Sequence, residues 1–145
     1  MKRSLVIILI LLAAAAITIQ LVPVNRTHPV ANPDDALQGP ATHILARSCF
    51  DCHSYNTTWP WYGRIAPVSW MLRRHIEEGR GKLNFSLWRQ YAPEKQLYLS
   101  KEAVKEVEEG GMPLPIYLRL HPEAKISPAD LDTLKAWSLS FEGIQ

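Results

Sequence analysis

The stretch Arg47-Ser48-Cys49-Phe50-Asp51-Cys52-His53 contains both cysteines of the 145-residue chain, and a histidine directly follows the second one. Its spacing is Cys-x-x-Cys-His. Two thiols three positions apart can each form a thioether bond to a vinyl group of haem, and the adjoining histidine can then reach the iron from the same side. The stretch therefore predicts one covalent haem c, attached at Cys49 and Cys52 with His53 as an axial ligand, and a fold that forms around it.

Two other kinds of site use similar residues. A redox-active disulfide would need a strand-helix-strand context, which the sequence does not indicate. A structural zinc ion would need a fourth ligand from a distant residue such as His75 or His121, because the chain has no second pair of cysteines. Both stay open beside haem as alternatives for the two thiols.

The sequence on both sides of the motif has helical periodicity and no convincing strand. Patterns of the i, i+3, i+4, i+7 type predict helices over residues 40–47, 67–79 and 93–109, with Gly79 as the terminator of the second. Ser86 is expected to cap a short turn, and Ser127-Pro128-Ala129-Asp130 resembles a capping box that starts a last helix. The predicted fold of the domain is all-α.

A second axial ligand is expected in the stretch Gly110-Gly111-Met112-Pro113-Leu114-Pro115. Two glycines let the backbone approach closely, and two prolines stop the preceding helix, so Met112 would lie in a stiff, non-helical loop. A thioether sulfur in that position raises the reduction potential relative to a second histidine. His75, on the apolar stripe of its predicted helix, is the alternative ligand, although the same stripe fits a hydrogen-bonded core histidine.

Other residues are predicted to surround the cofactor. Trp61 and Tyr62 follow the motif closely and could cover the macrocycle or reach its propionates, and Arg64 is a further propionate partner. A backbone carbonyl of Pro60 or Pro67 is expected to orient the ring of His53. The remaining histidines, at positions 28, 43 and 121, are interpreted as surface or linker residues.

The N-terminal segment has the pattern of an export signal that stays in the membrane. Lys2 and Arg3 precede a run from Leu5 to Val22 in which only Thr18 and Gln20 are polar. Eighteen helical residues span roughly 27 Å, which is close to the thickness of a bilayer core. Ala13 to Ala16 would suit a cleavage site, so a cleaved signal peptide is the alternative.

Both interpretations of that segment place the rest of the chain outside the cytoplasm. We expect a single span over residues 1–22, a Pro-rich tether over 23–40 and a haem domain over 41–145. The predicted location is the inner membrane, with residues 5–22 as the anchor and the haem domain on the periplasmic side.

The distribution of charge along the chain argues against nucleic acid as a binding partner. The net charge of +2 divides into +3 for residues 1–31 and −1 for residues 32–145, so the domain lacks the basic character of a nucleic-acid-binding protein. Within the domain, residues 64–89 carry a net +4 and residues 94–109 a net −2. This asymmetry could orient the domain toward an oppositely charged redox partner protein, although solvated helix faces explain it equally well.

Several motifs together resemble a known family, the haem-binding-domain family of small exported c-type cytochromes. They are Arg47 to Ser54, Trp59-Pro60-Trp61-Tyr62, Ala66-Pro67-Val68-Ser69-Trp70, Gly79-Arg80, Leu83-Asn84-Phe85-Ser86, Met112-Pro113-Leu114-Pro115 and His121-Pro122-Glu123-Ala124. The resemblance covers roughly residues 33–140 and implies covalent haem c on Cys49 and Cys52 with His53 as proximal ligand. The order of the helices and motifs is also similar to class I cytochromes c, which implies a small cytochrome c-like helical domain around the haem.

These observations predict a membrane-tethered, single-haem electron carrier rather than an enzyme, because His53 and Met112 would leave no open site on the iron. One alternative is a haem-based gas or redox sensor in which Met112 is displaced. Another is a peroxidase-like enzyme, for which His75 would be the residue to suspect, although no distal acid-base arrangement supports it.

Overall fold

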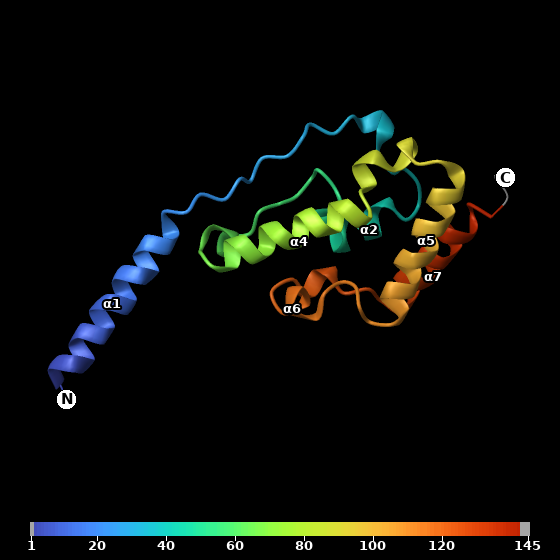
Figure 1. Ribbon diagram of the computed structural model, residues 1–145. Coiled ribbons are helices and arrows are strands. Elements are labelled where there is room, and N and C mark those ends of the chain that lie inside the picture. The colour runs from blue at the N-terminus through green and yellow to red at the C-terminus, as the bar shows by residue number, and fades with distance from the viewer. Residues whose placement is uncertain (1, 143–145) are drawn as a thin grey trace.

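Every regular element in residues 2–142, the part of the chain that the computed structural model describes, is helical, which confirms the predicted class (Figure 1). The α-helices are α1 (Lys2–Gln20), α2 (Thr42–Ser48), α3 (Phe50–His53), α4 (Val68–Lys82), α5 (Pro93–Glu108), α6 (Pro115–Leu118) and α7 (Pro128–Leu139). Short 3-10 helices join them: η1 (Pro33–Asp35), η2 (Trp61–Arg64), η3 (Phe85–Gln90) and η4 (Pro122–Ala124).

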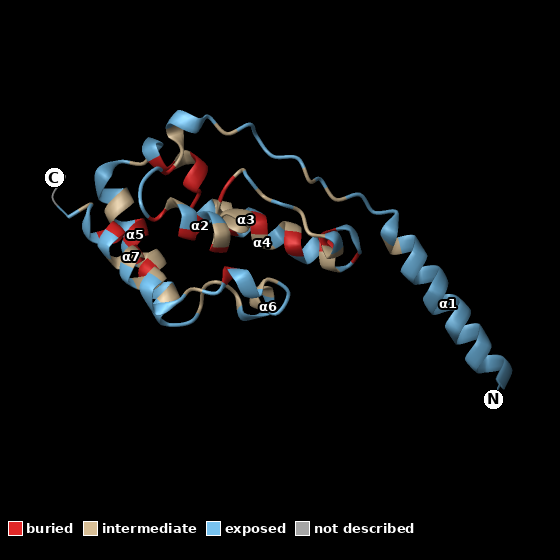
Figure 2. Ribbon diagram, turned by 180° about the vertical axis from the view of Figure 1, so that it is seen from behind, coloured by how far each residue is buried: buried red, intermediate tan, exposed pale blue. Residues whose placement is uncertain are grey.

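The core is an aromatic cluster between α2, η3, α5 and α7. Phe85 and Trp88 from η3 are 1% and 3% exposed, and their rings lie 5.9 Å apart. Trp137 of α7 packs against Trp88 at 5.3 Å, and Phe50 of α3 stacks on Phe85 at 5.4 Å. Figure 2 marks buried residues on α2, α5 and α7. The contacts of Phe85 with Phe50 and with Trp137 join the C-terminal helices to the cysteine motif.

Two predicted helix boundaries, the start of α7 and the end of α5, agree with the structure. Ser127 accepts a hydrogen bond from the N–H of Asp130 at 3.1 Å, and the Asp130 carboxylate accepts from the N–H of Ser127 at 2.9 Å, which completes a capping box for α7. Helix α5 ends one residue before its predicted boundary. Gly110 then takes the left-handed conformation with φ of +74°, and the chain leaves the helix there.

Helix α4 differs from its prediction, because Gly79 does not end it. The helix continues to Lys82, and Gly79 is buried where α4 crosses α3. A Cβ atom added at Gly79 would lie 2.7 Å from the carbonyl oxygen of Cys52, closer than packed atoms come. Gly79 therefore serves helix packing rather than termination, and a contact of that kind leaves no local signal in the sequence.

The short helix η3 also differs in its cap. Asn84, not Ser86, is the capping residue, and its side-chain oxygen accepts from the N–H of Ser86 at 3.0 Å. The hydroxyl of Ser86 instead accepts from the N–H of Tyr55 at 2.9 Å, beside the cysteine motif. Ser86, the residue predicted to be the cap, thus ties η3 to the segment that follows α3.

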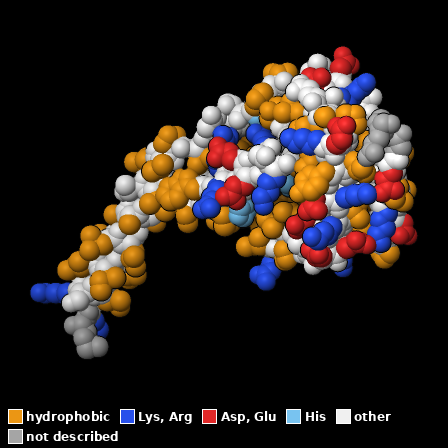
Figure 3. Space-filling view, turned by 45° about the vertical axis from the view of Figure 1, so that its right-hand side comes forward, with side chains coloured by type: hydrophobic (Ala, Val, Ile, Leu, Met, Phe, Trp, Pro, Cys, Tyr) orange, Lys and Arg blue, Asp and Glu red, His pale blue; other side chains and the backbone are white. Residues whose placement is uncertain are grey.

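Helix α1 lies outside the domain and is exposed along its length, with apolar side chains on all sides (Figure 3). Its 19 residues are long and apolar enough to cross a membrane. The residues that follow α1 are extended and lie along the domain (Figure 1). Gln20 bonds the backbone of Ala66, and Arg26 donates to the carbonyl of Gly63 at 3.3 Å.

Candidate functional site

The cysteine motif forms one helical turn at the junction of α2 and α3. The N–H groups of Cys52 and His53 both donate to the carbonyl of Cys49, at 3.2 and 2.9 Å, so the two thiols and the imidazole come from adjacent positions of one turn. The cysteines are free rather than joined in a disulfide. Burial raises the pKa of Cys49 to about 12 and that of Cys52 to about 11, so both are neutral thiols near neutral pH.

The ring of His53 is held by one of its nitrogens. Its Nδ1 lies 3.1 Å from the carbonyl oxygen of Leu83, just beyond the end of α4. Only a protonated Nδ1 can donate to that carbonyl, and Nε2 is then the nitrogen with a free lone pair. Burial lowers the pKa of His53, which favours this neutral form.

The carbonyl that orients His53 was predicted to belong to Pro60 or Pro67, and that prediction is wrong. Leu83 takes this role because α3 packs across the C-terminal half of α4, where Gly79 allows the close approach. The position of Leu83, thirty residues after the histidine, becomes evident only once the helices have packed.

Among the described residues, no three His, Cys, Asp or Glu side chains gather into a site for a metal ion. The predicted zinc alternative, which required His75 or His121 beside the motif, therefore has no support from the geometry.

Haem fits the residues that are present. Four buried polar atoms in the described part of the chain have no hydrogen-bond partner: the hydroxyls of Thr42 and Ser48, Nε of Arg47 and the indole N–H of Trp137. Trp137 and His53 both contact the ring of Phe85, each with its ring centroid at 6.4 Å. A haem would bring an aromatic plane to these rings and carboxylate acceptors to such donors, and an unpaired buried donor is costly without one.

The residues predicted around the cofactor divide into two groups. Tyr62 is half-buried, and burial raises its pKa. Its hydroxyl contacts His121, which stacks on Tyr117, and Tyr117 is bonded to Asp51 of the motif. Trp61 and Arg64, by contrast, are exposed; Trp61 retains 73% of its accessible surface. The structure thus brings Tyr62 to the motif and leaves the other two at the surface.

A hydrogen-bonded network beside the motif was missed in the sequence. Tyr117 of α6 donates to the carboxylate of Asp51 at 2.8 Å, and its ring stacks on His121 at 4.2 Å. Nε2 of His121 lies 2.8 Å from the hydroxyl of Tyr62, and its Nδ1 lies 3.0 Å from Glu123. His121 was interpreted as a surface or linker residue, which is wrong. The i, i+4 spacing of Tyr117 and His121 was the available signal.

The loop that contains Met112 joins α5 to α6 and is non-helical, as predicted. Its backbone is held by α5, since the N–H groups of Gly111 and Met112 both donate to the carbonyl of Glu106, at 2.9 and 3.0 Å. The Met112 side chain is half-buried, and so is that of His75 on α4. In the described part of the chain, no hydrogen bond or aromatic contact joins Met112 or His75 to His53. The ligand roles of these two residues therefore stay predictions.

A family model described as a haem-binding domain matches residues 14–140 of the chain. The chain belongs to the haem-binding-domain family. No curated protein and no solved structure matches it in the corresponding comparisons. As a haem-binding domain, the protein takes haem as its cofactor, and the turn with Cys49, Cys52 and His53 is the part of the described fold whose chemistry suits that group.

Proposed function

We propose that this haem-binding domain holds one haem c and transfers electrons at the outer face of the inner membrane. The observation that carries the proposal is the hydrogen bond from Nδ1 of His53 to the carbonyl of Leu83, which leaves Nε2 for an iron ion. When bound, haem supplies a reversible one-electron couple between ferric and ferrous iron.

Cys49 and Cys52 would hold haem through two thioether bonds. Each S–H group adds across a vinyl double bond, so that one S–C bond and one C–H bond form without any oxidant or reductant. The two thiols suit this addition because they are free, lie one turn apart and precede the histidine directly. Attachment of this kind keeps haem bound in either oxidation state.

His53 and Met112 would be the axial ligands. The Leu83 carbonyl orients the imidazole and increases its basicity, as an acceptor behind a metal-bound histidine does. Met112 would supply a thioether sulfur to the iron from its half-buried, non-helical loop, which two backbone bonds fix to the end of α5. With both axial positions filled, no position remains for a substrate, and this favours electron transfer over enzymatic turnover.

Membrane anchoring through α1 completes the proposal. The helix is apolar on all sides, and Lys2 and Arg3 precede its apolar run, which favours an N-terminus in the cytoplasm. The domain would then lie outside the cytoplasm, where haem would be attached to it. The redox partner would be a protein that meets this domain beside the membrane.

Absorption spectroscopy of the full-length protein, combined with variants, tests the proposal. We expect haem that survives acid extraction, a ferric thioether charge-transfer band, and slow or absent carbon monoxide binding to the ferrous form. Met112→Ala should remove the band, whereas His75→Ala should keep it. His28→Ala, which alters an exposed histidine of the connection, is the matched control and should leave every spectrum unchanged.

The same spectra separate the competing functions. Rapid carbon monoxide binding by the folded protein would indicate an open or displaceable ligand position and would favour a sensor or a peroxidase-like enzyme. An unchanged band in Met112→Ala would overturn the assignment of the second ligand. A colourless protein with free thiols by mass would overturn haem c itself.

A further inference from the structure

We propose that one face of the domain, the bilayer face, rests on the lipid surface beside α1. We define the bilayer face as Trp61, Arg64, Ile65 and Trp70, from η2, the residue that follows it and the first turn of α4. This inference rests on the proposed membrane anchoring, and it adds a second contact with the membrane: the folded domain itself binds anionic lipid headgroups and the region just beneath them.

The bilayer face lies where the membrane helix meets the domain. The side chain of Gln20, the last residue of α1, accepts from the N–H of Ala66 at 2.9 Å and donates to its carbonyl at 3.1 Å. Ala66 directly follows Ile65 in the bilayer face. Figure 1 shows the start of α4 as the part of the domain nearest to the end of α1.

The segment that follows α1 is also held to this part of the domain by hydrogen bonds. The indole N–H of Trp59 donates to the carbonyl of Arg26 at 3.1 Å, and Arg73 of α4 donates to the carbonyl of Asn25 at 2.8 Å. Together with the contacts of Gln20, these bonds hold the bilayer face at the level where α1 would leave the hydrocarbon.

The large apolar side chains of this face are exposed. Trp61 is 73% exposed, Ile65 46% and Trp70 37%. Tryptophan is enriched at the level of lipid headgroups, since its ring is apolar and its N–H can still reach polar partners. Leu21 and Val22, the exposed residues that directly follow α1, continue the same apolar surface toward the membrane.

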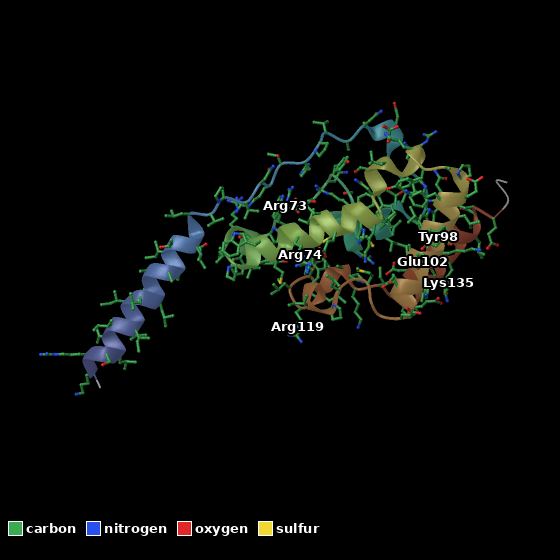
Figure 4. The ribbon with its side chains drawn as sticks, in the orientation of Figure 1. Arg73, Arg74, Tyr98, Glu102, Arg119 and Lys135 are labelled. Carbon is green, nitrogen blue, oxygen red and sulfur yellow. The ribbon has the colours of Figure 1, made fainter. Side chains whose placement is uncertain are left out.

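Charge favours an anionic lipid surface as the occupant. Residues 61–76 contain three arginines and no aspartate or glutamate. Arg64 is exposed, whereas Arg73 and Arg74 lie on α4 beside the face and pair with Glu77 and Glu78 of the next turn (Figure 4). Because Arg73 and Arg74 are paired, Arg64 is the arginine of this face that would attract anionic headgroups most directly.

Photocrosslinking of the full-length haem-loaded protein tests the inference. The protein is reconstituted in vesicles of phosphatidylethanolamine and phosphatidylglycerol, with p-benzoylphenylalanine introduced in turn as Trp61→p-benzoylphenylalanine, Tyr98→p-benzoylphenylalanine and Leu9→p-benzoylphenylalanine. Tyr98 is the matched control, since it is 61% exposed but lies on α5, at the end of the domain away from α1 (Figure 4). Leu9 reports on α1, and absorption of each sample reports on haem.

We expect lipid adducts by mass spectrometry at positions 9 and 61, with at least tenfold fewer at position 98. Adducts at 9 but not at 61 would overturn the bilayer face and leave the membrane anchor intact. Adducts at neither position would overturn both. Crosslinks from position 61 to a second chain or to haem would also overturn the inference, because they would identify a different occupant of this face.

Discussion

Replacement of Gly79 by alanine tests the packing of α4 on the cysteine motif. The added Cβ atom would lie 2.7 Å from the carbonyl oxygen of Cys52 and 3.4 Å from its Cβ atom, and the first of these neighbours is backbone that cannot rotate away. Overpacking of this kind costs about 1–3 kcal/mol. Alanine regains up to about 1 kcal/mol in a helix interior. We therefore expect Gly79→Ala to lower the free energy of unfolding by up to about 2 kcal/mol.

Gly81 provides a matched control two residues further along the same helix. A Cβ atom there meets nothing within 4 Å, so Gly81→Ala should change stability by zero to about 1 kcal/mol in the favourable direction. Urea unfolding of the three full-length proteins in detergent, followed by circular dichroism, measures both effects. The packing argument is refuted if Gly79→Ala proves as stable as Gly81→Ala.

Three further predictions concern other parts of the domain. Asp130→Asn should cost about 1 kcal/mol, because it weakens the cap of α7. The cap with Ser127 holds the pKa of Asp130 at about 2, below its usual 3.8, so its stabilisation is present above about pH 4 and is lost as pH falls toward 2, as acid unfolding can measure. Tyr117→Phe should cost about 1–2 kcal/mol, through the lost bond to Asp51. Burial raises the pKa of Tyr117, so this variant should leave the tyrosinate signal below about pH 11 unchanged in an ultraviolet titration. Trp88→Ala should cost about 3–5 kcal/mol in urea unfolding, since the ring is buried in the aromatic cluster.

Features that depend on a few neighbouring residues could be predicted from the sequence. The capping box at Ser127 and the helix that follows it were predicted because both partners of the cap lie within one turn. The turn with Cys49, Cys52 and His53 needs only its own spacing to be recognised. The non-helical loop after α5 was indicated by the glycines and prolines around Met112.

Features that arise from packing between distant segments could not be predicted in the same way. Gly79 has the residue type of a helix terminator, and only the approach of Cys52 explains why it lies inside α4. The acceptor for His53 comes from Leu83 rather than from the nearer prolines. Trp61 has the residue type of a pocket wall, and its exposure depends on which side of η2 the domain leaves uncovered.

The contact between His53 and Leu83 makes the imidazole sensitive to events far from it in the chain. The carbonyl belongs to the residue after α4, so any displacement of that helix end would lengthen the bond and reduce the electron-donating strength of the ring. In the haem-loaded protein, such a displacement would shift the midpoint potential without touching the coordination sphere. Under the proposed electron-transfer function, a partner that presses on the end of α4 would thereby change the driving force of its own reaction with the haem.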